Sequence, residues 1–130
     1  MAQTLNTRGY DSPIVYKDKA VSSTVILVDS TPRNLTGWRI TNPNSSTAYF
    51  KFFDASATAS VTLGTTEPCK EFSIPAIGEI FVSHTKGTSH YYFSNGICIV
   101  GVTGLATSST GTPILPLDVE IYYSRNQGGL

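Results

Sequence analysis

The chain has 130 residues, the size of a single domain, and its nine Lys and Arg residues balance nine Asp and Glu residues. Only 14% of the residues are charged, against about 25% in an average protein. Such a chain lacks the basic surface by which proteins bind nucleic acid or anionic membranes, so we expect neither partner. The polar first ten residues do not resemble a signal peptide, and no stretch approaches the length of a membrane span.

The composition favours β-structure over helix. Ser and Thr make up about a quarter of the residues, and seven Tyr and six Phe accompany abundant Val and Ile. These residue types, apart from Ser, prefer the pleated, half-buried backbone of a strand. No segment of any length shows the helical period of 3.6 residues. We therefore expect an all-β protein.

The first 19 residues differ in pattern from the rest of the chain. They have no clear period of two or 3.6 residues around Pro13, and they predict an extended N-terminal arm with room for a short strand at residues 14–16. Such an arm orders when it binds a partner. Residues 20–124 form the predicted domain, and residues 125–130 form a C-terminal tail.

Short strands separated by turn residues fill the predicted domain. The turn signal Asn42-Pro43-Asn44-Ser45 predicts that residues 35–54 form a β-hairpin. Residues 97–102 are apolar on both faces and are the best candidate for a central strand. The expected strands are residues 21–28, 35–41, 48–53, 69–74, 80–82, 91–93, 97–102 and 117–123. This count predicts a single-domain antiparallel β-sandwich, with a jelly roll as the expected topology.

The sequence shows no catalytic or metal-binding motif. His84 and His90 are the only histidines, and their spacing in a polar loop does not suit a metal site. The carboxylates are scattered, and no phosphate-binding or dinucleotide-binding loop is present. Cys69 and Cys98 are far apart in the sequence and predict two buried, reduced thiols, the alternative being a disulfide if the fold brings them together. We therefore expect no enzyme activity, no cofactor and no metal.

The aromatic residues raise the question of surface binding. Trp38 shares a strand face with Ile40 and is expected in the core, the other possibility being a stacking platform for a sugar ring. Neighbours in Tyr91-Tyr92-Phe93 point to opposite faces, so at least one ring is exposed or lies at an interface. Aromatic rings are frequent anchors of interfaces. The subunit-interface candidates are Tyr49, Tyr91, Tyr92 and Tyr122.

One series of strands and turns runs through residues 35–44 (LTGWRITNPN), 48–54 (AYFKFFD), 72–76 (FSIPA) with Gly78, 93–97 (FSNGI), 102–104 (VTG) and 118–123 (DVEIYY). This series resembles small virion structural proteins of tailed bacteriophages, and within that group it looks most like the capsid decoration, or cement, proteins. The resemblance covers about residues 35–124 and is a pattern of strands and turns rather than a chemical signature.

The resemblance implies a β-sandwich that forms a homotrimer and binds the major capsid protein on the outside of an icosahedral head. There it would bridge capsid subunits and resist the pressure of the packaged DNA, after assembly in the host cytoplasm. Residues 1–19 lie outside the match, so no binding residue of the family can be assigned to them. From the arm itself we expect Arg8, Tyr10, Tyr16, Lys17 and Lys19 to dock to the capsid.

Two other functions are compatible with the same strands. The first is a tail, fibre or head-spike module that contacts the host surface, with the polar loops 55–66 and 104–113 as its recognition tip. The second is a carbohydrate-binding, lectin-like module, which needs an exposed aromatic shelf that includes Trp38.

Overall fold

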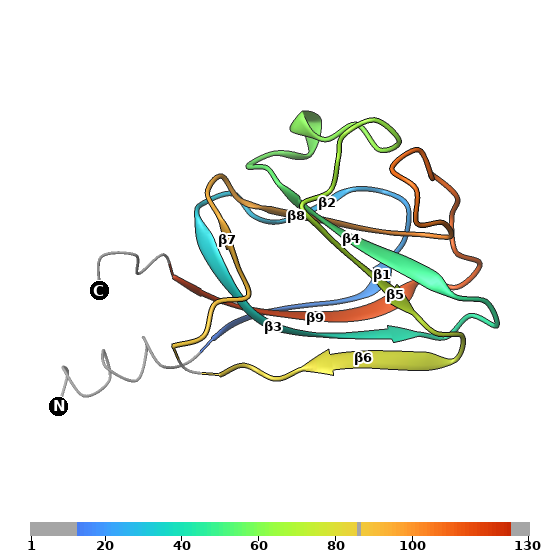
Figure 1. Cartoon of the computed structure of the whole chain (residues 1–130), viewed down its shortest axis with the longest axis horizontal. Helices are drawn as coiled ribbons and strands as arrows, with labels where there is room; N and C mark the ends of the chain where they lie inside the picture. Colours follow the sequence, from blue (N-terminus) through green and yellow to red (C-terminus); the bar gives the residue numbers. More distant parts are fainter. Residues whose placement is uncertain (1–12, 86, 126–130) are drawn as a thin grey trace, which may run out of the picture.

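The computed structural model describes residues 13–85 and 87–125, and within them the chain folds into two antiparallel β-sheets (Figure 1). The only helical element described is one turn of 3₁₀ helix, η1 (Thr58–Ser60). The strands are β1 (Ile14–Val21), β2 (Ile26–Asp29), β3 (Arg33–Asn42), β4 (Ala48–Asp54), β5 (Lys70–Ile74), β6 (Gly78–Val82), β7 (Tyr91–Phe93), β8 (Ile97–Val102) and β9 (Leu117–Arg125). The predicted all-β sandwich is confirmed.

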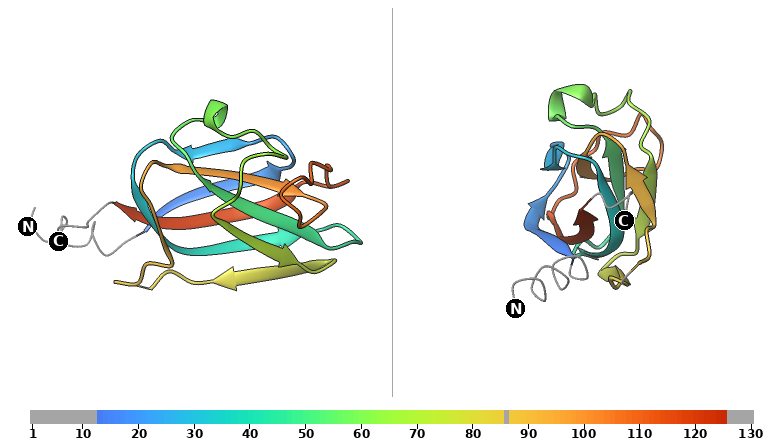
Figure 2. Two further views of the ribbon diagram at one scale, coloured as in Figure 1. Left: turned by 45° about the horizontal axis from the view of Figure 1, so that its top comes forward. Right: turned by 90° about the vertical axis from the view of Figure 1, so that its left-hand side faces the viewer.

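The chain passes repeatedly from one sheet to the other, and only β4–β5 and β6–β7 are consecutive strands of the same sheet. The first sheet has the order β1-β9-β3-β6, with the short β7 also paired to β3, and the second has the order β2-β8-β4-β5. The two sheets lie face to face in two layers (Figure 2). Antiparallel pairs are nested: β1 with β9, β2 with β8, β3 with β6, and β4 with β5. This nesting supports the jelly-roll topology, which stays a prediction.

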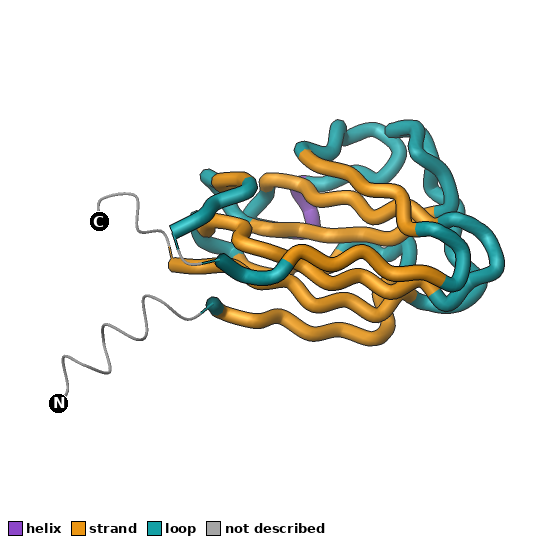
Figure 3. The backbone as a smooth tube through the Cα atoms, turned by 60° about the horizontal axis from the view of Figure 1, so that its bottom comes forward, coloured by secondary structure: helices purple, strands orange, loops and turns teal. Residues whose placement is uncertain are grey.

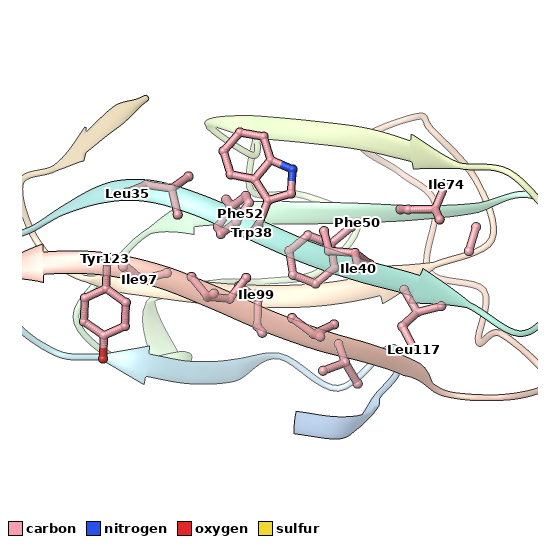
Figure 4. Packing of buried hydrophobic residues seen from close by; sticks show 14 of the residues in the cluster. Leu35, Trp38, Ile40, Phe50, Phe52, Ile74, Ile97, Ile99, Leu117 and Tyr123 are labelled. Atoms are coloured by element: carbon pink, nitrogen blue, oxygen red, sulfur yellow. The ribbon is translucent and has the colours of Figure 1, made fainter. Parts of the chain in front are cut away.

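The core between the sheets is built from alternate residues of each strand. On β9, Leu117, Val119 and Ile121 are fully buried, because every second side chain of a strand points to the same face. Aromatic rings fill the middle of the core (Figure 4), where the centroids of Trp38 and Phe72 lie 4.7 Å apart and Phe52 meets Phe50 edge to face at 5.1 Å. Such contacts stabilise the core beyond the area that they bury.

The second sheet is covered on its other face as well. The segment that follows β4 folds back over it, so that Val61 and Leu63 pack against Phe53 and Val100. All six residues of β8 are consequently buried, as expected for the central strand of that sheet. Part of loop 55–66 is therefore packed against a second, smaller core. Among the described residues, no such segment lies over the outer face of the first sheet, as Figure 1 shows for β1, β9, β3 and β6.

The predicted hairpin over residues 35–54 is wrong. Its two strands, β3 and β4, belong to different sheets, and β3 pairs with β6, β7 and β9 instead. The turn residues after Asn42 carry the chain from one layer to the other. The side chain of Asn42 is buried at this crossing and bonds to the chain on both sides of it, which a hairpin turn does not require.

The domain limits also differ from those expected. Residues 14–19, predicted as part of the arm, belong to β1, which pairs with β9 along its length. Ile14 and Tyr16 pack against the core while Val15 and Lys17 face outward, so this segment alternates like any half-buried strand. The predicted strand 21–28 is divided between the end of β1 and β2. Residues 1–12 and 126–130, with most of the arm and the tail, lie outside the described residues.

Replacement of Phe52 by alanine should destabilise the protein strongly. Phe52 is fully buried and contacts the rings of Trp38, Phe72 and Phe93, so its removal leaves a large apolar cavity. We expect the free energy of unfolding to fall by about 3–5 kcal/mol, measured by urea denaturation. Phe81→Ala is the matched control, because Phe81 is 55% exposed, and it should change stability by about 0.5 kcal/mol. Equal losses in the two variants would contradict the assigned core.

Candidate binding surfaces

The described residues contain no cluster of side chains suited to a metal ion. Within residues 13–85 and 87–125, no three His, Cys, Asp or Glu side chains form a group that could hold a metal ion. The same residues contain no helix long and apolar enough to cross a membrane. His84 contacts the hydroxyl of Thr36 through Nδ1 at 2.9 Å, and the ring of His90 lies edge-on against Trp38 at 5.2 Å. The histidines therefore contact the domain rather than each other.

The two cysteines are free thiols, as predicted. Cys98 is buried on β8, whereas Cys69 is half-buried just before β5. Loss of solvent around the Cys69 thiol raises its pKa to about 11. A thiol with so high a pKa is protonated at neutral pH and is a weak nucleophile.

The aromatic residues singled out from the sequence have different environments. Trp38 is in the core and only 5% exposed, so the shelf that a lectin-like module would need is not present. Tyr91 is half-buried against the core, Tyr92 is exposed and Phe93 is buried, which confirms the alternation expected there. Tyr49 packs beneath the cover of the second sheet. Tyr122 lies on the outer face of the first sheet, where its ring meets Phe81 edge-on.

Three of the five predicted docking residues can be placed. Lys17 and Lys19 are exposed on β1, at the edge of the first sheet. Tyr16 turns toward the core, and its hydroxyl donates a hydrogen bond to Asp18 at 2.9 Å. Partial burial and this carboxylate raise the pKa of Tyr16 to about 12. Arg8 and Tyr10 lie outside the described residues.

The outer face of the first sheet carries a network of charges around Arg39. Its guanidinium lies 3.1 Å from Glu120, 3.5 Å from Asp118 and 3.7 Å from Glu79, which belong to the two strands beside β3. The hydroxyl of Tyr122 donates to Glu120 at 2.7 Å. The hydrogen bonds from Tyr122 and Arg39 lower the pKa of Glu120 below its ordinary value of 4.5. Because these charges already have partners, this face resembles a solvated surface more than a vacant binding site.

The end of the sandwich to which β3 runs has a different character. The connections that gather there (Figure 3) are residues 22–25, 43–47, 75–77 and 103–116, and none of them contains a charged residue. We call this surface the uncharged end. It carries exposed aliphatic side chains, with Ile77 72% and Ile114 92% exposed, and Leu115 beside them. At the opposite end, the terminal residues of β2, β3 and β4 are charged: Asp29, Arg33 and Asp54.

Two buried asparagines fix the loops of the uncharged end. The amide nitrogen of Asn42 donates to the carbonyl oxygens of Ser46, Ile74 and Pro75 at 2.9–3.1 Å. Its Oδ1 accepts hydrogen bonds from the backbone and side-chain nitrogens of Asn44. The side chain of one residue thus joins the connections β3–β4 and β5–β6, each of which crosses from one sheet to the other.

Asn44 extends this network to the long connection between β8 and β9. Its Nδ2 donates to the carbonyl of Leu115 at 2.8 Å, and its Oδ1 accepts from the Leu115 backbone nitrogen at 2.7 Å. Its own carbonyl accepts from the backbone of Ile77 at 2.9 Å. Ile77 has a φ of +47°, a conformation rare for a β-branched residue, which persists where the surroundings determine it. The hydrogen bonds of Asn44 therefore hold Ile77 and Leu115 in place.

A hollow of about 160 Å³ opens at this end. It lies between the turn of residues 44–48 on one side and residues 113–115 on the other, with Thr103 also in its wall. Its walls are uncharged. The arrangement has the elements of a protein-binding surface: a rigid frame, exposed aliphatic side chains and a polar, uncharged rim.

Sequence analysis did not identify Ile77, Ile114 and Leu115. They occur as isolated apolar residues in loops that are rich in Ser, Thr and Pro, and only folding brings residues 75–77 next to residues 113–115. One signal was available, because the segment from Thr103 to Pro116 contains no charge despite its exposure. A long exposed loop without charge is a sign of a surface that another molecule covers.

Comparison with known proteins assigns no family to this chain. No protein-family model and no curated protein sequence matches it. Among solved structures, the chain is similar to PirA with a TM-score of 0.43 and 14% identity, over 86% of this chain and 94% of PirA. It is also similar to the coat protein of tobacco streak virus with a TM-score of 0.40 and 11% identity, over 88% of each chain. At TM-scores below 0.5, neither likeness indicates what this chain binds.

Replacement of Asn42 by aspartate should destabilise the domain with almost no change in shape. The variant places a carboxylate oxygen where the amide nitrogen now donates to three carbonyl groups, and the site is fully buried. We expect a loss of about 3 kcal/mol at pH 7, measured by chemical denaturation, and a smaller loss at low pH, where the acid can again donate. Asn34→Asp is the control, because Asn34 uses its Oδ1 as an acceptor from Ser89. A loss in Asn42→Asp no larger than in this control would contradict the role of the amide.

The network around Arg39 should make stability depend on pH in the acid range. Glu120 has a lowered pKa in the folded protein, so its contribution is complete above its ordinary pKa of 4.5 and is lost as the pH falls through the lowered value. Glu120→Gln should cost about 0.5 kcal/mol at pH 7 and should flatten the decline in melting temperature below pH 4.5. Glu71→Gln, at an exposed position on β5, is the control and should leave the decline unchanged. Parallel pH profiles for wild type and Glu120→Gln would contradict this role.

Proposed function

We propose that this chain is a virion structural protein, a decoration protein that forms homotrimers and binds the major capsid protein on the outer surface of a bacteriophage head. Its role is to bridge capsid subunits and stabilise the shell, with no catalytic step, no cofactor, and neither nucleic acid nor membrane as partner. The observation that carries this proposal is the uncharged end, where Ile77, Ile114 and Leu115 are exposed on loops that hydrogen bonds hold rigid. Large aliphatic side chains fixed in this way favour a surface that another protein covers.

Two further features support a structural role. The resemblance to decoration proteins over residues 35–124 covers most of the sandwich, and the nested strand pairing agrees with the jelly roll expected for it. The chain also has few charges and no net charge, which suits close packing of many identical copies.

The uncharged end and the edge strand β1 of the first sheet allow a division of roles. β1 begins and β9 ends at the end opposite to the uncharged end (Figure 1). Lys17 and Lys19 are exposed on β1 and would contact the shell together with Arg8 and Tyr10 of the preceding segment. The alternative of a host-contacting tip is less well supported for loop 55–66, because Val61 and Leu63 of that loop pack against the second sheet.

Binding to empty expanded heads of the virus that carries this chain tests the proposal. The truncation should remove residues 1–12 only, because a deletion of residues 1–19 would take most of β1 and its contacts with the core. We expect the wild type to co-sediment with heads, and the truncation and the double variant Lys17→Glu/Lys19→Glu to bind about tenfold more weakly or worse.

Lys70→Glu, a single charge reversal on the edge strand of the other sheet, is the control and should bind like the wild type. Failure of the wild type to bind heads would overturn the proposal. If the purified chain instead blocks adsorption of the virus to its host, the function is that of a tail, fibre or spike module. Equal binding by the wild type and the truncation would leave the head as partner and exclude the arm from the contact.

A further inference from the structure

We propose that two copies of this chain meet through the uncharged end, with Ile114 of one copy seated in the hollow of the other. This assigns a surface to the self-association proposed above, and it rests on that part of the proposed function but not on binding to a shell. The tyrosines expected at the subunit interface lie elsewhere, on the sheets. The contact now inferred uses loops that the sequence did not identify.

Ile114 is presented to solvent by residues that are themselves fixed. It is 92% exposed, more than any other large apolar side chain of the described residues. Pro113 before it is buried, and the backbone of Leu115 after it is bound on both sides by Asn44 at 2.7 and 2.8 Å. A side chain held outward in this way loses little backbone freedom when it binds, so more of the contact energy is retained as affinity.

The hollow beside Ile114 has the size of one such side chain. It measures about 160 Å³, and an apolar cavity of about 150 Å³ in another protein holds a benzene molecule. Ile114 also forms part of its rim, so that a projection and a hollow lie side by side on one surface. Identical subunits need a surface of this kind, because each copy must offer both halves of the contact.

The absence of charge favours a second copy as the occupant. None of the residues in the four connections of the uncharged end is charged, so two copies that meet through these loops place no like charges in the centre of the contact. The nearest carboxylates, Glu79 and Asp118, lie 3.7 and 3.5 Å from the Arg39 guanidinium. A charged partner would have to bury its charges there against no counter-charge, which is unfavourable. Ile77 and Leu115 would extend the apolar centre of the contact, and the Ser and Thr residues of the loops would form its polar rim.

One contact of this type serves either a twofold pair or a closed ring. In a pair the projection of each copy enters the hollow of the other, and in a ring each copy inserts into the next. The homotrimer implied by the resemblance corresponds to a ring of three. The inferred surface is the same in both, and the number of copies is read from the mass.

The test is the mass of the purified chain in solution, measured by light scattering over a range of concentrations. We expect the wild type to associate and Ile114→Asp to be at least tenfold weaker in self-association, because it places a charge in an uncharged hollow. Leu105→Asp is the matched control: Leu105 is 53% exposed in the same connection but does not line the hollow, so it should associate like the wild type.

Thermal unfolding of each variant shows whether it is folded, and the exposure of Ile114 predicts that it is. Should Ile114→Asp nevertheless fail to fold, Ile114→Ala removes the projection without adding charge and should also weaken association.

A wild type that stays monomeric at every concentration would overturn the proposal, as would equal association of wild type and Ile114→Asp. Loss of head binding by Ile114→Asp without any change in mass would assign the hollow to the capsid protein and also overturn it. If the wild type associates and Ile114→Asp does not, but the wild type fails to bind heads, the result counts against the proposed function and leaves the inferred contact between copies standing.

Discussion

The buried side chain of Asn42 is the interaction on which the functional end of this protein depends. A chain that passes from one sheet to the other leaves carbonyl groups without strand partners, and buried carbonyls need donors. The amide of Asn42 supplies hydrogen bonds to three of them, and its oxygen orients Asn44. Through Asn44 the same network reaches the connection between β8 and β9. The position of the exposed aliphatic side chains therefore depends on polar groups beneath them.

The two sheets differ in whether a segment of the chain covers their outer face. The second sheet is covered by the chain's own segment around Val61, which gives it a small core on that side. On the first sheet, the described residues leave the outer face uncovered, and ion pairs around Arg39 lie there beside the rings of Phe81 and Tyr122. The most exposed aliphatic side chains are concentrated at one end, which is why the loops rather than the sheets provide the proposed contact.

The two proposed contact surfaces differ in their chemistry. The uncharged end combines a hollow with a projection of matching size, a combination suited to identical partners. The strand edge of β1 presents two exposed lysines, Lys17 and Lys19, which suit a different partner with acidic groups. A protein with both surfaces can hold its own copies together while it attaches to a shell, as the proposed function requires.

The sequence by itself determined the local structure. Its alternation of apolar and polar residues located most strands, placed Trp38 in the core and identified residues 97–102 as a central strand, because the period of two depends only on neighbours along the chain. Tertiary structure alone decided which sheet each strand joins. The turn after Asn42 is compatible with a hairpin or with a crossing between layers, and contacts with distant residues such as Ile74 select the crossing. Ile77 and Ile114 form one surface for the same reason: loops far apart in sequence become neighbours only when the sheets that carry them pack together.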